Sequence, residues 1–207
     1  MVRPRDAASL VVSRGSGRET QVLLGRRPSN DRFMPGVHVF PGGRVDREDA
    51  GRVIAAKLRP TVARRLGRRA SIQQTRALAV AALRETHEET GLVFGRLEGG
   101  LLLPDLSRLE YLGRAITPSG SPIRYHARFL HARIEDASGE LRSNGELLDL
   151  DWYSIDEALG LNIIDVTERI LEQLRDFSSG RRPGDVFVHY RRQRQHVRRE
   201  PPDRDRS

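Results

Sequence analysis

Three carboxylates stand close together in the middle of the sequence, within Arg84-Glu85-Thr86-His87-Glu88-Glu89-Thr90-Gly91. In a helix, Glu85, Glu88 and Glu89 would lie at positions i, i+3 and i+4, so their side chains would share one face. Like charges at this spacing repel each other and destabilise the helix unless a cation offsets them. Carboxylates suit hard divalent cations such as Mg²⁺ or Mn²⁺. The cluster therefore indicates a metal-dependent site.

A long helix and a glycine turn are the elements that must position these carboxylates. Ser71 or Gln73 can begin a helix that runs to about Thr90, and Gly91 is suited to the position just after its end. Upstream, a short strand at 37–40 ends in Pro41-Gly42-Gly43, where two glycines permit a backbone that other residues rarely adopt. We expect this turn and the helix to meet.

Short apolar runs separated by glycine, proline and serine predict several further elements. We expect helices at about 156–159 and 166–177, a basic helical segment inserted at about 50–72, and strands at 7–13, 20–26, 109–117, 123–134, 147–153 and 186–190. Strands grouped around one long helix favour an α/β (α+β) sandwich. We expect one domain over residues 1–190, followed by a disordered basic tail at 191–207, where little can be buried.

Composition excludes several classes of protein. The 207 residues contain no cysteine, which rules out disulfides, thiolate zinc sites and a cysteine nucleophile. No apolar run approaches the ~20 residues of a membrane span, and the start of the sequence does not resemble a secretory signal. We therefore expect a cytoplasmic protein that does not bind a membrane. The net charge is +8, nearly all from arginine, because Lys57 is the only lysine.

The acidic segment and the glycine turn together resemble the Nudix box, whose usual form is G-x5-E-x7-R-E-U-x-E-E-x-G-U, where U is apolar. Gly43 supplies the first position, and Arg84-Glu85, Glu88-Glu89 and Gly91-Leu92 supply the second half, with Thr86 at an apolar position. The resemblance implies a Nudix hydrolase, a metal-dependent diphosphatase with an α/β/α sandwich around a mixed central sheet.

The first half of the box departs from the usual pattern. Asp49 stands where the first glutamate is expected, and Glu48 is adjacent. In addition, 34 residues separate Asp49 from Arg84, where the usual box has seven. A loop insertion of this kind costs little free energy, so the site can survive it. The sequence leaves open whether Glu48 or Asp49 takes the role of the missing glutamate.

The resemblance also implies roles for individual residues. Glu85, Glu88, Glu89 and the carbonyl of Gly43 would hold Mg²⁺ or Mn²⁺. Arg84 would fix the end of the helix by reaching an acid of the Gly43–Asp49 loop. Glu146, in the loop before the strand at 147–153, is a candidate general base or metal ligand, and Glu85 is the alternative base.

A longer stretch, Phe33-Met34-Pro35-Gly36-Val37-His38-Val39-Phe40-Pro41-Gly42-Gly43-Arg44-Val45-Asp46, resembles the signature of Nudix hydrolases that act on coenzyme A (CoA). It is most similar to the acyl-CoA diphosphatase branch, which also has a long insertion in its box. The resemblance implies cleavage of CoA or acyl-CoA to 3′,5′-ADP and 4′-phosphopantetheine or its acyl form. Arg26 and Arg27 could hold phosphates through bidentate contacts, and Phe33 and Met34 could line a groove for pantetheine.

Other functions remain open at this point. The same chemistry would serve ADP-ribose, NADH, nucleoside triphosphates or RNA caps, and a catalytically silent domain could bind a nucleotide or RNA as a sensor. The small-molecule nucleotide is the main partner expected, and homodimers are common in the family. The arginine-rich tail could contact nucleic acid, but only Tyr190 lies near it for base stacking, so we expect a solvated tail.

Overall fold

One large sheet forms the centre of the protein in a computed structural model that describes residues 3–31, 34–181, 184–191 and 194–201. Its strands are β1 (Arg5–Arg14), β2 (Gln21–Arg26), β3 (His38–Val39), β4 (Gly42–Arg44), β7 (Glu110–Ile116), β8 (Tyr125–Arg133), β9 (Leu148–Ser154), β10 (Asp185–Arg191) and β11 (Arg194–Glu200). The strand order is β11-β10-β7-β8-β1-β2-β3, while β4 pairs with β1 and β9 with β2. Parallel pairs (β1–β8, β7–β10) and antiparallel pairs make the sheet mixed.

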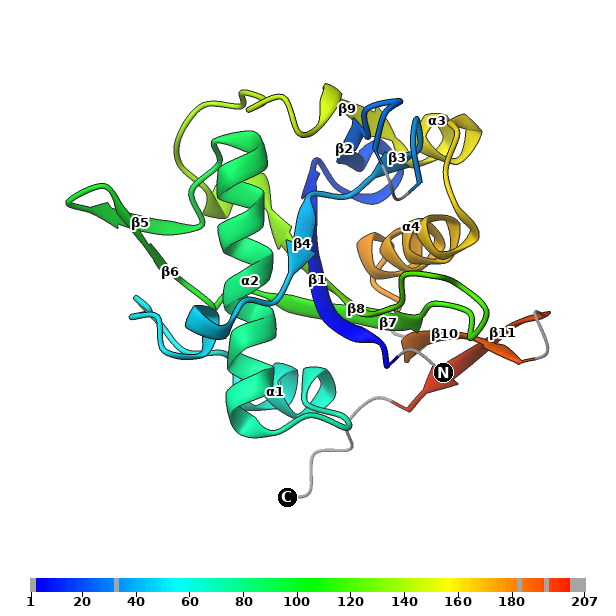
Figure 1. Ribbon diagram of the computed structural model, residues 1–207. Coiled ribbons are helices and arrows are strands. Elements are labelled where there is room, and N and C mark those ends of the chain that lie inside the picture. The colour runs from blue at the N-terminus through cyan, green and yellow to red at the C-terminus, as the bar shows by residue number, and fades with distance from the viewer. Residues whose placement is uncertain (1–2, 32–33, 182–183, 192–193, 202–207) are drawn as a thin grey trace.

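Helices cover both faces of this sheet (Figure 1). α1 (Pro60–Leu66) and α2 (Ile72–Thr90) lie on one face, and α3 (Ile155–Gly160) and α4 (Asp165–Ser178) lie on the other. The α/β/α sandwich with a mixed sheet is therefore confirmed.

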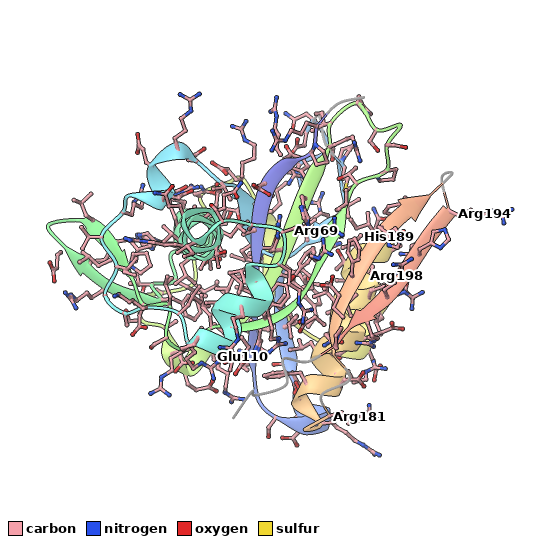
Figure 2. The ribbon with its side chains drawn as sticks, turned by 90° about the horizontal axis from the view of Figure 1, so that it is seen from below. Arg69, Glu110, Arg181, His189, Arg194 and Arg198 are labelled. Atoms are coloured by element: carbon pink, nitrogen blue, oxygen red, sulfur yellow. The ribbon has the colours of Figure 1, made fainter. Side chains whose placement is uncertain are left out.

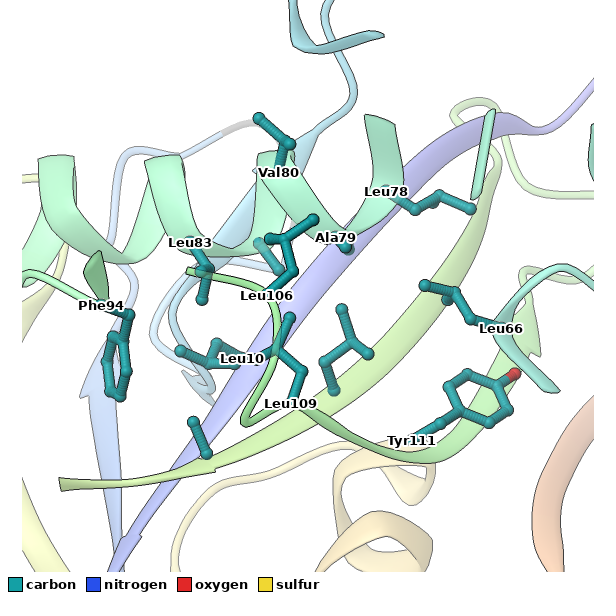
Figure 3. Packing of buried hydrophobic residues seen from close by; sticks show 14 of the residues in the cluster. Leu10, Leu66, Leu78, Ala79, Val80, Leu83, Phe94, Leu106, Leu109 and Tyr111 are labelled. Atoms are coloured by element: carbon teal, nitrogen blue, oxygen red, sulfur yellow. The ribbon is translucent and has the colours of Figure 1, made fainter. Parts of the chain in front are cut away.

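The alternation of side chains along β1 divides the core in two. Leu10 and Val12 point to the α1–α2 side, and Val11 points to the α3–α4 side, as the two-residue period of a strand requires. Figure 3 shows the first cluster, in which Leu78 and Leu83 of α2 pack over Leu10. Burial on both faces fixes the register of β1, and with it the neighbouring strands that form the site.

α2 has the limits that its sequence predicts. The hydroxyl of Ser71 accepts from the amide of Gln74, whose side chain in turn accepts from the amide of Ser71, a capping box. At the other end Gly91 adopts φ 73°, the left-handed conformation that glycine tolerates best. No helix in the described ranges is long and apolar enough to cross a membrane.

The structure differs from the sequence expectations in three places. A hairpin of β5 (Gly95–Glu98) and β6 (Leu101–Pro104) was not expected. The inserted segment is helical only in α1, because Pro60 suits a first turn and Gly67 follows its end. Within the tail expected to be disordered at 191–207, residues 194–200 form β11, which pairs with β10 along its whole length, while residues 192–193 and 202–207 lie outside the described residues.

Ion pairs connect the inserted segment to β10. Arg65 of α1 donates to both carboxylate oxygens of Asp185, and Arg68 donates to the same carboxylate at 3.1 Å. Asp185 is fully buried. Residues that the sequence inserts between the two halves of the box thus hold the C-terminal strands of the sheet.

Candidate active site

A cavity of about 590 Å³ extends across neighbouring strands of the sheet, beside the end of α2. Its floor contains three alanines, Ala7, Ala127 and Ala115, which are directly paired across β1, β8 and β7. Their small side chains leave the space that larger residues would fill. Lining residues come from every strand between β4 and β10, so the cavity extends over roughly 19 Å at ~4.8 Å per strand.

The glycine turn and α2 meet at one end of this cavity, as expected. Glu85 lies so close to Gly43 that a Cβ on Gly43 would overlap with its carboxylate. Glu89 accepts a hydrogen bond of 2.8 Å from the amide of Gly42. Glycine at 43 therefore lets the backbone of β4 approach the carboxylate of Glu85, and glycine at 42 lets it approach the backbone of β1.

The carboxyl group of Glu89 sits in an unfavourable place for a negative charge. Burial, together with the nearby carboxylates of Glu85 and Glu146, raises its pKa to about 8. The Gly42 hydrogen bond and the charge of Arg27 act in the opposite direction. Three carboxylates thus act on one another around the same end of the cavity.

Of the two acids between which the sequence leaves the choice open, Asp49 is the one that contacts Arg84. The Nε of Arg84 donates to Oδ1 of Asp49 at 2.9 Å and its Nη2 to Oδ2 at 3.1 Å, a bidentate pair. Asp49 is fully buried, whereas Glu48 is exposed. Arg84 also donates to the carbonyl of Arg44 in β4, so it joins the loop, the strand and the helix.

Arg84 also holds two of the three carboxylates of α2. It donates to Glu85 at 2.9 Å and to Glu88 at 3.0 Å. Burial acts to lower the pKa of Arg84, but the hydrogen bond to Asp49 and the charge of Glu85 raise it above its ordinary value. Glu85 and Glu89 line the cavity, whereas Glu88 lies beside Arg84 and does not.

The donor set at this end has the chemistry of a divalent-cation site. In the described ranges, no group of three or more His, Asp or Glu side chains is placed to hold a metal ion by itself. Glu85 and Glu89 nevertheless line one cavity with Gly43, and their pKa values are raised first by burial. A cation there would offset the buried negative charge, and oxygen ligands suit Mg²⁺ and Mn²⁺.

The remaining residues that the sequence singled out fall in different places. Glu146, in the loop before β9, lines the cavity, as do Arg27 and Met34. Arg26 does not line it, and its Nε instead donates to Asp149 at 2.7 Å. Phe33 lies outside the described residues.

A polar group at the far end of the cavity was not identified from the sequence. The hydroxyl of Tyr190 in β10 donates to Asp165 at 2.5 Å, and both residues line the cavity. Asp165 begins α4, and its other carboxylate oxygen accepts from the amide of Val166. An aspartate at a helix start is a recognisable signal, but nothing local links it to a tyrosine 25 residues later.

Comparisons with known proteins were made by sequence and by structure. No protein-family model and no curated protein sequence matches the chain. A solved Nudix hydrolase from Alicyclobacillus acidocaldarius is 28% identical, with a TM-score of 0.62 over 83% of this chain and 91% of that one. A MutT Nudix hydrolase from Burkholderia pseudomallei is 22% identical, with a TM-score of 0.53 over 84% and 99%. The Nudix domain of Shewanella oneidensis NrtR, solved with ADP-ribose, is 17% identical, with a TM-score of 0.52 over 86% and 90%.

These likenesses define the class of protein. The fold is the Nudix fold, present over most of the chain and nearly all of each neighbour. The 28% identical hydrolase supports a Nudix hydrolase enzyme, and the other two neighbours support the fold.

Proposed function

We propose that this chain is a divalent-metal-dependent diphosphatase that cleaves a nucleoside diphosphate linked to a second group, with CoA or acyl-CoA as its substrate. The observation that carries the proposal is the cavity with Glu85, Glu89 and Glu146 at one end and an alanine floor beyond them. Structural neighbours named as Nudix hydrolases, and one bound to ADP-ribose, support the general reaction.

Glu85, Glu89 and the carbonyl of Gly43 would hold the cation, and Glu88 would join them by turning away from Arg84. Nudix hydrolases generally need divalent metal ions. A bound Mg²⁺ or Mn²⁺ would offset the charge that builds on phosphate oxygens during attack. Arg84 and Asp49 act as positioning residues, because they join the loop to α2 and do not line the cavity.

Glu146 would receive the proton of the attacking water. The oxygen of water bonds to one phosphorus, the bond from that phosphorus to the bridging oxygen breaks, and the bridging oxygen leaves with the second phosphate. Glu146 is exposed to the cavity, whereas Glu85 is already engaged by Arg84. A positioned base contributes about 10²- to 10⁴-fold to such a step.

The shape of the cavity favours a long substrate group beyond the diphosphate. Arg27 lines the acidic end and can bind a phosphate oxygen. The alanine floor then offers an apolar path, and the Tyr190–Asp165 pair offers hydrogen-bond partners at its far end. Pantetheine has this alternation of methylene groups and amides. The match of Phe33 to Asp46 with the CoA-directed signature points the same way.

A substrate panel tests the proposal. Purified protein with Mg²⁺ or Mn²⁺ is incubated with CoA, acetyl-CoA, a long-chain acyl-CoA, ADP-ribose, NADH, a nucleoside triphosphate and capped RNA, and products are identified by mass spectrometry. We expect 3′,5′-ADP from the CoA compounds, and turnover that Glu89→Gln reduces by at least about 10²-fold while the fold is retained. Cleavage of another nucleotide while the CoA compounds stay intact would contradict the proposed substrate. No turnover of any compound would contradict the proposal that the protein is a diphosphatase.

A larger side chain on the alanine floor of the cavity tests whether the pantetheine part of the substrate lies along that floor. Ala127→Leu places a larger side chain in the cavity, so KM for acyl-CoA should rise about tenfold or more, while kcat for a short diphosphate substrate should stay within about twofold. Ala132→Leu, on the opposite face of β8, is unsuitable as a control because its site is fully packed. Ala63→Leu, in α1, is the control, because Ala63 is partly exposed, does not line the cavity and belongs to neither core cluster. Equal effects of Ala127→Leu on long and short substrates would contradict this path.

A further inference from the structure

The two C-terminal strands form an antiparallel ribbon with two different faces. Val186 and Val188 of β10 are buried under α4, so their register fixes which side chains point the other way. The opposite face, called here the outer ribbon face, carries Phe187, His189, Arg194, His196 and Arg198. Phe187 pairs with Arg198 and His189 pairs with His196 across the two strands. Figure 2 shows His189, Arg194 and Arg198 along this ribbon.

Flat groups are stacked along the outer ribbon face. The guanidinium of Arg114 lies 3.6 Å from the ring centroid of Phe187. Phe187 stacks on His189 with centroids 4.8 Å apart, and His189 stacks on His196 at 5.4 Å. Arg114 is fixed in turn by two hydrogen bonds to Glu200 at the end of β11. A row of ordered planar groups therefore ends in the exposed ring of His196.

The charges around this row are positive. Arg194 and Arg198 are exposed, and so is Arg69 in the connection between α1 and α2. That connection lies beside the ribbon, because Arg68 donates to the carbonyl of Pro201, directly after β11. Burial lowers the pKa of His189, and Arg198, His196 and Arg114 lower it further. The carboxylates of the two strands are already paired with arginines: Asp185 is fully buried, and Glu200 is partly exposed.

We propose that the outer ribbon face binds single-stranded nucleic acid. Exposed arginines suit the phosphate backbone, and ordered rings within the same face suit stacked bases. The stack of Phe187, His189 and His196, flanked by Arg194 and Arg198, offers both kinds of contact within a few residues. This site is separate from the cavity of the proposed diphosphatase and does not depend on its activity.

Other occupants fit this face less well. A second copy would place the same cationic β11 against itself, which is unfavourable for like charges. A membrane would favour large apolar side chains beside the cations, but on this face of the described ribbon the apolar ring, Phe187, lies half-buried under Arg114. Val197 is exposed but points to the opposite face. An acidic protein would use the arginines and leave the ring stack unused.

Fluorescence anisotropy with a labelled 12-nucleotide oligo(U) RNA, and with oligo(dT) of the same length, tests the proposal on the full chain. We expect binding at 50 mM salt. With phosphates on Arg69, Arg194 and Arg198, the plot of log affinity against log salt should have a slope of about −2, from about 0.7 per contact. Arg194→Ser with Arg198→Ser should weaken binding roughly tenfold or more and reduce the slope by about 1.4.

The ring variants and a control make the result specific. His189→Ala with His196→Ala should weaken binding roughly fivefold or more, without a change of slope, because stacking is lost and phosphate contacts are kept. Arg96→Ser with Arg133→Ser removes the same charge from β5 and the end of β8, and binding should stay within about twofold. Circular dichroism and the diphosphatase assay on each variant show that the fold is kept.

Three outcomes would overturn the proposal. The first is no binding to either oligonucleotide at 50 mM salt. The second is an equal loss in the control variant and in the Arg194/Arg198 variant, which would assign binding to net charge alone. The third is equally tight binding to poly-glutamate or to phosphatidylglycerol vesicles with no effect of the ring variants, which would assign the face to an acidic protein or a membrane.

Discussion

Two buried aspartates, Asp49 and Asp185, are each held by arginines from a distant part of the chain. Asp49 receives two hydrogen bonds from Arg84, and Asp185 receives bonds from Arg65 and Arg68. Both aspartates are fully buried. The difference lies in their surroundings: Arg84 also holds Glu85 beside the cavity, whereas Arg65 also donates to the carbonyl of Tyr111 within the core.

This comparison shows that one kind of contact can serve two purposes. The Arg84–Asp49 pair helps to hold Glu85 beside the cavity, so its loss should affect turnover and stability together. The Asp185 cluster joins the inserted segment to β10, so its loss should affect stability alone. Because Arg84 is more deeply buried than Arg65 or Arg68, breaking its pair should also cost more.

The largest effect is expected for Asp49→Ala. It leaves the guanidinium of Arg84 without its buried partner, so the free energy of unfolding should fall by about 3–5 kcal/mol. Displacement of the loop by ~1 Å should lower kcat by roughly 10²-fold. Chemical denaturation and steady-state kinetics measure both effects. Glu48→Ala is the matched control, because Glu48 is adjacent but exposed, and a similar loss in that variant would contradict the assignment of Asp49.

The next effect is the pH dependence of Glu89. Its pKa is about 8 in the folded protein and near 4.5 ordinarily, so the neutral carboxyl stabilises the fold at low pH. That stabilisation is lost as the pH rises from about 4.5 to 8. In metal-free protein, the stability of the wild type relative to Glu89→Gln should fall by about 2–4 kcal/mol over this range.

Added Mg²⁺ or Mn²⁺ should reverse that fall in the wild type, because a cation favours the ionised carboxylate. Thermal melts across pH, with and without metal, make the measurement. The same metal should leave unchanged the difference in melting temperature between the wild type and Asp185→Asn. This result would distinguish the surroundings of Glu89 from the Asp185 cluster. If metal changed that difference as much as it changes the stability of the wild type relative to Glu89→Gln, the two regions would not differ in the way proposed here.

Asp185→Ala should have a smaller effect. Arg65 and Arg68 are partly exposed, so water can solvate the charges that remain, and we expect a loss of about 1–3 kcal/mol in the free energy of unfolding. The value of kcat/KM should stay within about twofold. If kcat/KM fell as it does in Asp49→Ala, the inserted segment would have a role at the cavity that its contacts do not show.

The smallest effect is expected for Arg68→Ala. This arginine shares Asp185 with Arg65 and also contacts Glu200 at 3.4 Å. Its removal keeps the Arg65–Asp185 pair, so denaturation should show a loss of about 0.5–1 kcal/mol. Arg108→Ala, at an exposed residue far from this cluster in the chain, serves as the control, and a loss above 2 kcal/mol in Arg68→Ala would mean that Arg65 alone does not hold Asp185.

The sequence predicts the parts of the molecule whose signals are local. Ser71 and Gly91 mark the ends of α2, and the spacing of Glu85 and Glu89 places both on the face that meets the glycine turn. The Gly99-Gly100 turn of the unexpected β5–β6 hairpin is also a local signal, but the two strands that it joins have only four residues each.

The parts that could not be predicted depend on contacts between distant residues. Glu48 and Asp49 are adjacent acids, and both are candidates from the sequence. The turn at Arg47–Ala50 directs Asp49 inward and leaves Glu48 exposed. The alanine floor depends on the register of β1 against β8, about 120 residues away. Residues 194–200 are too polar to suggest burial, and pairing with β10 makes a strand of them nonetheless.

The place of β1 in the sheet has a consequence for biosynthesis. β1 stands between β2 and β8, and its longest ladder is with β8. At about 5–20 residues per second, a ribosome makes β8 roughly 6–24 s after β1. During that interval the apolar edge of β1 has no permanent neighbour, and non-local pairing of this kind is slow and prone to aggregation. We therefore expect a nascent chain arrested before Tyr125 to bind chaperones more strongly than one arrested after α4.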